Sequence, residues 1–171
     1  MFHFINKIRN FLKYGNMFAG FHVSCDVDVV HTRNGKILNK QRIHNIVVTQ
    51  GINYLRAMIG STGTDRANYI GLSSATSTPA ASSTELDATV YTSAIDTGLA
   101  RAQGTYTAGG NGVFTMAKTF TAASTGPEVV GSAGLYTTSS GSSLFAGVAL
   151  NNSVTMYAND SITITWTVTF S

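Results

Sequence analysis

The sequence predicts an all-β protein with one or two short helices, arranged as an antiparallel β-sandwich or jelly-roll-like fold. The carboxyl-terminal segment alternates strictly between large apolar residues and threonine. Several further short apolar runs are separated by turns rich in Gly, Asn and Ser. Only 11% of the residues are charged, whereas Ser and Thr are abundant. Because threonine packs well on a half-exposed strand, this composition also favours β-structure.

The length of 171 residues suits one domain with its own core. We expect residues 22–171 to form a single β-sandwich domain that follows an N-terminal arm, residues 1–21. In residues 1–13, apolar and basic side chains recur at helical spacing, which indicates a short amphipathic helix. It is too short and too interrupted by charge to be a secretory signal or a membrane span. We expect it to dock onto a protein surface through Phe4, Ile5, Lys7, Ile8, Arg9, Phe11, Leu12 and Lys13.

The first β-hairpin is predicted by Asn34-Gly35, the strongest short hairpin signal, which lies between strand patterns at 22–32 and 36–49. A helix should follow, with Thr49 as its N-cap and Gly60 at its end. Its apolar positions recur at helical spacing, at Ile52, Leu55, Met58 and Ile59.

Residues 69–73 then read as a strand, and residues 74–84 as a long polar loop. A second hairpin is predicted from strands at 100–107 and 113–121, because the glycines between them permit positive φ angles. The sequence favours a turn at this glycine-rich stretch and argues against a phosphate-binding loop, since no helix follows it.

Two buried strands are predicted at 127–137 and 143–150, and a separate strand at 153–157. The final strand, residues 162–170, carries large apolar residues on one face and threonines on the other. Such a strand belongs to a sheet with one face on the core. Trp166, the single tryptophan, is therefore expected to be buried.

No catalytic, cofactor-binding or metal-binding motif emerges. The four histidines lie outside any recognisable motif, and the single cysteine, Cys25, excludes an intrachain disulfide. Asp26 and Asp28 share one face of a strand, but two carboxylates are few for a cation, so a solvated pair is favoured. Glu85 and Asp87 are expected to act as turn or helix-start residues. We expect a protein that is not an enzyme and needs no cofactor.

Basic residues concentrate in the first third of the chain. Up to Arg56 there are eight Lys and Arg against two acidic residues, and beyond it three against six. The basic hairpin lacks aromatic side chains that could stack on bases, so nucleic acid is not expected as a partner. A membrane is a conceivable partner only through the N-terminal arm. The residues of the basic hairpin are Arg33, Lys36, Lys40 and Arg42.

From residue 45 to the end, the order of short motifs resembles small virion proteins of tailed bacteriophages and related viruses. The motifs are Val47-Val48-Thr49-Gln50-Gly51, Tyr69-Ile70-Gly71-Leu72, Thr84-Glu85-Leu86, Arg101, Glu128, Ala133-Gly134-Leu135-Tyr136, Ser143-Leu144-Phe145-Ala146 and the closing strand from Asp160 to Phe170. Such proteins serve as tail, tail-tip, fibre-attachment or head-decoration subunits. Gly147 stands where they tend to carry a basic residue, and residues 1–21 have no counterpart among them.

The resemblance implies a virion structural protein, a capsid-, portal- or tail-associated subunit that assembles with itself as a ring or trimer and contacts other virion proteins. In this interpretation the arm anchors the subunit to a neighbouring virion protein. The alternative is a carbohydrate-binding or adhesive module that recognises a host-surface glycan. A cluster of exposed aromatic side chains would favour that alternative.

Overall fold

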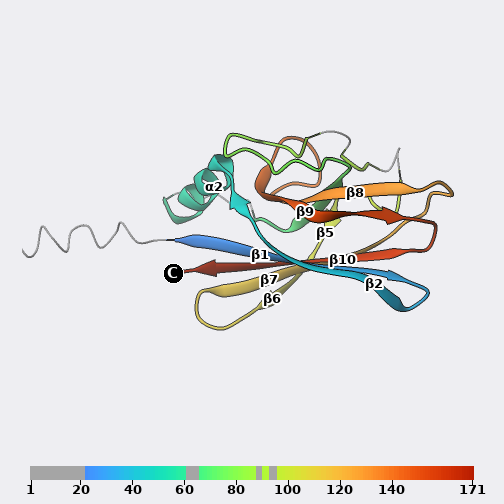
Figure 1. Ribbon diagram of the computed structural model, residues 1–171. Helices are drawn as coiled ribbons and strands as arrows, with labels where there is room; N and C mark the ends of the chain where they lie inside the picture. The colour runs from blue at the N-terminus through green and yellow to red at the C-terminus, as the bar shows by residue number, and fades with distance from the viewer. Residues whose placement is uncertain (1–21, 61–65, 88–89, 93–95) are drawn as a thin grey trace, which may run out of the picture.

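The computed structural model describes residues 22–60, 66–87, 90–92 and 96–171, and these residues form two antiparallel sheets packed face to face (Figure 1). The predicted all-β sandwich class is therefore confirmed. Sheet A has the order β2 (Lys36–His44), β1 (Val23–Arg33), β10 (Ser161–Phe170), β7 (Val113–Thr121) and β6 (Thr105–Ala108). Sheet B has the order β3 (Ile46–Val47), β9 (Leu144–Met156), β8 (Glu128–Tyr136), β4 (Tyr69–Ser73) and β5 (Ala102–Gln103).

The main core lies between the sheets and includes the inward faces of β1 and β10. Val27 is opposite Trp166 in the β1–β10 register, and Met116 of β7 is opposite Trp166 on its other side. All three side chains are buried, which confirms the prediction for Trp166. The threonines of β10 face outward, as the alternation predicted, and Thr163 shares a hydrogen bond of 2.8 Å with Thr119. The outward face of sheet A is thus hydroxyl-rich.

The predicted hairpin at Asn34-Gly35 is confirmed. Both residues have positive φ angles, 50° for Asn34 and 75° for Gly35, and β1 pairs with β2 on either side of them. Consecutive positive φ angles match the twist of the two strands, which is why Asn-Gly is favoured there.

The predicted strand at 36–49 is wrong in its second half, because the chain changes sheets after His44. Residues 36–44 pair with β1 in sheet A, whereas β3 pairs with β9 in sheet B. The helix α2 (Thr49–Gly60) follows directly. Its first hydrogen bond runs from the Ile52 N–H to the Val48 carbonyl, so Thr49 is the first helical residue and not the N-cap.

The apolar face of α2 is largely exposed, although the helix itself was correctly predicted. Ile52, Met58 and Ile59 are all exposed, and Gly51 is the buried residue of the helix. A Cβ at Gly51 would lie 2.2 Å from the carbonyl oxygen of Phe145, so α2 approaches β9 backbone to backbone. The helix therefore sits at one end of the sandwich without covering it.

The predicted strand at 100–107 is also wrong as a single element. Residues 102–103 pair with β4 in sheet B, and residues 105–108 pair with β7 in sheet A. Gly104 lies at this crossing, where a Cβ would come 2.8 Å from the Met116 sulfur. The absence of a side chain lets the chain pass over the core.

The predictions of separate strands at 143–150 and 153–157 are wrong, because β9 runs through both. The register of β8 and β9 shifts at this point: Val130 is opposite Val154, and Ser132 is opposite Ala149. The bulging backbone of Asn152 is bound by the side chain of Gln41, which donates to the carbonyl at 2.7 Å and accepts from the N–H at 3.1 Å. Gln41 of sheet A thus supplies hydrogen-bond partners for both backbone groups of Asn152, at the point where the pairing of β8 and β9 shifts.

The loop between β4 and β5 covers the outer face of sheet B. Its backbone bonds to the sheet, for example from the Leu144 N–H to the Thr84 carbonyl at 3.0 Å. Leu86 of this loop forms a second, smaller core with Val48, Tyr136 and Leu144. Strand β4, most of β8 and the first half of β9 are therefore buried on both faces, as the sequence predicted for 127–137 and 143–150. No helix in the described residues is long and apolar enough to cross a membrane.

Candidate assembly surfaces

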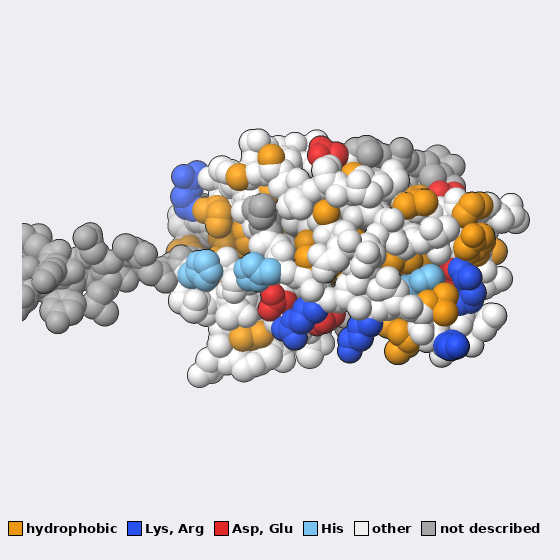
Figure 2. All heavy atoms as spheres, in the orientation of Figure 1, with side chains coloured by type: hydrophobic (Ala, Val, Ile, Leu, Met, Phe, Trp, Pro, Cys, Tyr) orange, Lys and Arg blue, Asp and Glu red, His pale blue; other side chains and the backbone are white. Residues whose placement is uncertain are grey.

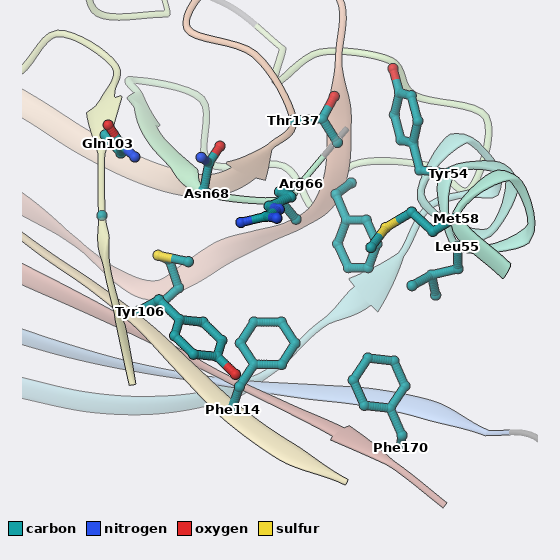
Figure 3. Close-up of a pocket in the computed structure, with 14 residues that line it drawn as sticks. Tyr54, Leu55, Met58, Arg66, Asn68, Gln103, Tyr106, Phe114, Thr137 and Phe170 are labelled. Carbon is teal, nitrogen blue, oxygen red and sulfur yellow. The ribbon is translucent and has the colours of Figure 1, made fainter. Parts of the chain in front are cut away.

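An apolar groove lies at the end of the sandwich where β1 begins and β10 ends. It has a volume of about 690 Å³ and opens between α2 and sheet A (Figure 3). Leu55 and Met58 line it from α2, and Phe114 and Phe170 face them from β7 and β10. We call it the open-end groove. Its lining is completed by Tyr54, Arg66, Ala67, Asn68, Gln103, Gly104, Tyr106, Met116, Thr137 and Phe145.

Aromatic side chains dominate the sheet A wall of this groove. The rings of Tyr106 and Phe114 lie with centroids 5.6 Å apart, and those of Phe114 and Phe170 lie 6.0 Å apart. Tyr106 is 60% exposed, because it stands on β6, an edge strand whose residues are all exposed. Large exposed aromatic surfaces of this kind are typical of binding sites, because they give up much apolar area when a partner covers them.

Two polar atoms at the groove lack an interaction. Among the described residues, no group hydrogen-bonds to the side-chain oxygens Thr137 Oγ1 and Asn68 Oδ1. Both residues line the groove, but the two oxygen atoms are themselves buried. Buried polar atoms are costly to leave unpaired, so they add to the free energy that the folded chain must offset at this end.

The opposite end of sheet A contains a buried carboxylate, Asp160, and we call this end the closed end because its polar groups bind one another. Arg33 donates two hydrogen bonds to the Asp160 carboxylate, from Nε at 2.7 Å and from Nη2 at 2.6 Å. His31 Nε2 lies 3.2 Å from the same carboxylate, and the Tyr157 N–H donates to it at 2.9 Å. The hydrogen bonds from Arg33 hold the pKa of Asp160 well below its usual range, although burial opposes them. We call these residues the Asp160 cluster.

A second carboxylate at this closed end, Asp96, binds backbone. It accepts hydrogen bonds from the N–H groups of Gly98, Ala123 and Ser124 at 2.7 to 3.2 Å. Burial alone would raise the pKa of Asp96, but these N–H donors lower it below its ordinary value. The turn at 96–99 is thereby fixed against the residues that follow β7.

Glu85 is not the simple turn residue that the sequence predicted. Both of its carboxylate oxygens accept hydrogen bonds from Arg101 Nη2, at 2.7 and 2.8 Å. The Arg101 guanidinium also lies 3.5 Å from the ring centroid of Tyr136 and donates to the Gly141 carbonyl at 2.9 Å. This stacked and hydrogen-bonded arginine attaches the covering loop to sheet B, which is a structural role.

The basic hairpin is only partly a free positive surface. Arg33 belongs to the Asp160 cluster, and Arg42 lies 3.3 Å from the Asp26 carboxylate, which His44 also contacts at 2.9 Å. The contact with His44 lowers the pKa of Asp26. Lys36 and Lys40 are exposed. Figure 2 shows that basic side chains gather on the β1–β2 side of the molecule, interspersed with acidic and apolar ones.

Asp26 and Asp28 face outward on β1, on one face as predicted, between buried positions of the strand. In the part of the chain that the structure describes, no three His, Cys, Asp or Glu side chains come together to hold a metal ion. Cys25 is buried, which raises its pKa to about 12, so it is not a reactive thiol.

The predicted docking residues, Phe4 to Lys13, lie outside the described residues, so their role stays a prediction. Sequence reasoning missed the open-end groove, because its lining comes from elements far apart in the chain. It also missed the Asp160 cluster, since the sequence indicated Asp160 only as the first residue of the closing strand. Comparisons with models of protein families, with curated proteins and with solved structures gave no match.

Proposed function

We propose that this protein is a non-catalytic structural subunit of a virus particle, which assembles with itself and with other virion proteins. The motif order from residue 45 onward, which resembles small virion proteins, supports the viral part of the proposal. The open-end groove carries the assembly part. A groove of about 690 Å³ lined by aromatic and aliphatic side chains is a surface that gains stability when another chain covers it.

The sheet edges add to this argument. Strands β2 and β6 form the two edges of sheet A, and every residue of β6 is exposed. Exposed edge strands readily pair with other chains, and neighbouring subunits in an assembly can cover them. Ile37 and Leu38 on β2 are also exposed, next to Lys36. Lysine on an edge opposes uncontrolled pairing, so we expect specific contacts instead of aggregation.

The location in a particle can be tested directly. Particles should be purified from a culture that produces this protein, and their proteins quantified by mass spectrometry. We expect the chain at a fixed number of copies per particle, and gold-labelled antibodies against it should mark one site on each particle. A chain that remains in the supernatant while particles form normally would overturn the proposal.

A second candidate function is binding to a host-surface glycan, and one feature favours it. The groove combines the exposed ring of Tyr106 with the polar side chains of Gln103 and Arg66, and ligand sites commonly pair aromatic faces with a few polar groups. Trp166 cannot contribute, because it is buried. A glycan array with the purified protein tests this function. Binding that Tyr106→Ala removes and Tyr157→Ala leaves intact would establish it in place of assembly at the groove.

A further inference from the structure

We propose that the open-end groove of each subunit receives the apolar residues of the N-terminal segment, residues 1–13, of a neighbouring copy. This inference rests on the proposed self-assembly and names the contact that produces it. The groove, the position at which the chain enters the sandwich and the pattern of residues 1–13 each support it.

The chemistry of the two surfaces matches. Residues 4–12 supply five large apolar side chains at the spacing of one helix face: Phe4, Ile5, Ile8, Phe11 and Leu12. As a helix these nine residues would be about 13 Å long. The groove offers facing walls of aliphatic side chains from α2 and aromatic side chains from sheet A. Docking an amphipathic helix into an apolar groove is a common mode of recognition.

The chain begins its first strand beside this groove. Val23 is opposite Phe170 in the register of β1 and β10, and Phe170 lines the groove. Before Val23, His22 and Ser171 exchange backbone hydrogen bonds at 2.6 and 2.9 Å, which extends the strand pairing by one residue. The chain therefore enters along the strand axis from beyond the end of the sheet. Residues 14–21 can span about 26 Å when extended, enough to reach an adjacent subunit.

Apolar contacts should stabilise the docking of residues 1–13 in the open-end groove. Lys7 and Arg9 lie between the apolar positions of the segment, and Lys13 follows them. Among the described residues that line the groove, the charged one is Arg66, which is also basic, so it offers these side chains no opposite charge. We expect the association to persist at high salt, where a contact held by surface ion pairs would weaken.

Met58 and Ile59 provide a matched pair of variants. Both are exposed residues of α2, but Met58 lines the groove and Ile59 does not. In the full-length protein, Met58→Lys should weaken self-association at least tenfold by light scattering, and Ile59→Lys should leave it unchanged. Ile8→Asp changes the docking segment instead of the groove, and it should weaken self-association as much as Met58→Lys does. Unfolding in urea would verify that all three variants keep the stability of the parent protein.

A cross-linking experiment shows whether the docked segment belongs to the same chain as the groove or to a neighbouring copy. Ile8→Cys and Met58→Cys are made in separate full-length chains and co-expressed, so that a disulfide between the two positions must join two copies. Cys25 is buried and does not compete. We expect a cross-linked dimer on oxidation, and none when Ile59→Cys replaces Met58→Cys.

The possible negative results distinguish a failure of this inference from a failure of the proposed function. A single chain that carries both Ile8→Cys and Met58→Cys is the comparison. If this chain forms an internal disulfide while the two separate variants give no cross-linked dimer, the segment occupies its own groove and the inference is wrong. If Met58→Lys and Ile8→Asp leave the oligomer intact, the subunit assembles through another surface, and the proposed function survives without this contact. If the parent protein is a monomer at all concentrations, both proposals fail.

Discussion

The two ends of the sandwich are built from different chemistry. At the closed end, the carboxylates of Asp160 and Asp96 bind an arginine, a histidine and several backbone N–H groups, all within the chain. At the open end, the apolar and aromatic walls of the groove face one another across about 690 Å³ with little between them. The closed end satisfies its polar groups internally, whereas the open end leaves apolar area for a partner. Stability should therefore be most sensitive to the closed end, and association to the open end.

The largest effect is expected from Asp160→Asn. The variant removes the carboxylate charge that Arg33 and His31 contact, and leaves the arginine without its bidentate partner. We expect a loss of about 2–3 kcal/mol in the free energy of unfolding, since Asp160 is buried and loses charge-assisted hydrogen bonds, although Arg33 itself is partly exposed. Urea unfolding measures it. Asp28→Asn, on the outward face of the same sheet, is the control and should change the stability by less than about 0.5 kcal/mol.

The same cluster predicts a pH dependence. The folded-state pKa of Asp160 is lowered by Arg33, while the unfolded value is about 3.9. A lowered pKa contributes stability above the unfolded value, and this contribution is lost as the pH falls through the folded value. The part of the stability difference between the parent protein and Asp160→Asn that comes from the carboxylate charge should thus shrink as the pH falls below 4. A difference that stays unchanged between pH 4 and pH 2 would contradict the role of Arg33.

Gly51→Ala tests the backbone packing of α2 against β9 beside the open-end groove. The added methyl group would lie 2.2 Å from the carbonyl oxygen of Phe145, so the helix must move away from β9. We expect a loss of about 1–3 kcal/mol and faster hydrogen exchange in α2, as for other overpacked sites. Gly60→Ala in the same helix has open space around its Cβ. That control should be neutral or slightly stabilising.

Arg101→Lys should have a smaller effect. Lysine cannot reproduce the pair of hydrogen bonds to Glu85 or the stacking on Tyr136. We expect a loss of about 1–2 kcal/mol, seen first as easier proteolysis of the covering loop, residues 74–92. Arg42→Lys, at an exposed ion pair with Asp26, makes the same chemical change and should cost less than about 0.5 kcal/mol. Equal effects at the two positions would contradict the structural role of Arg101.

Sequence reasoning succeeded where one face of a strand meets water. In β10 the alternation of Ile, Trp and Val with threonine identifies both the strand and its buried face, and Asn34-Gly35 identifies the first turn. In sheet B the burial on both faces removes that alternation, so the strand predictions were least exact there. The split of 100–107 at Gly104 and the continuity of β9 past Asn152 depend on contacts with Met116 and Gln41. These contacts lie far away in sequence and leave no local signal.

The candidate site was less accessible to prediction than the fold. Residues 4–13 were recognisable as an amphipathic segment, but the groove that we propose as their receptor is formed by α2, β7, β9 and β10 together. Its α2 wall was visible as Leu55 and Met58 at helical spacing. That this face would remain uncovered follows from the close approach of Gly51 to β9, which the sequence pattern alone does not specify.

Electron microscopy of the purified full-length protein tests the central claim, self-assembly as a structural subunit, most directly. We predict closed rings or trimers of one size, in which adjacent subunits meet at the open-end groove. Single particles of about 18.1 kDa, the mass of one chain, at every concentration would contradict the claim.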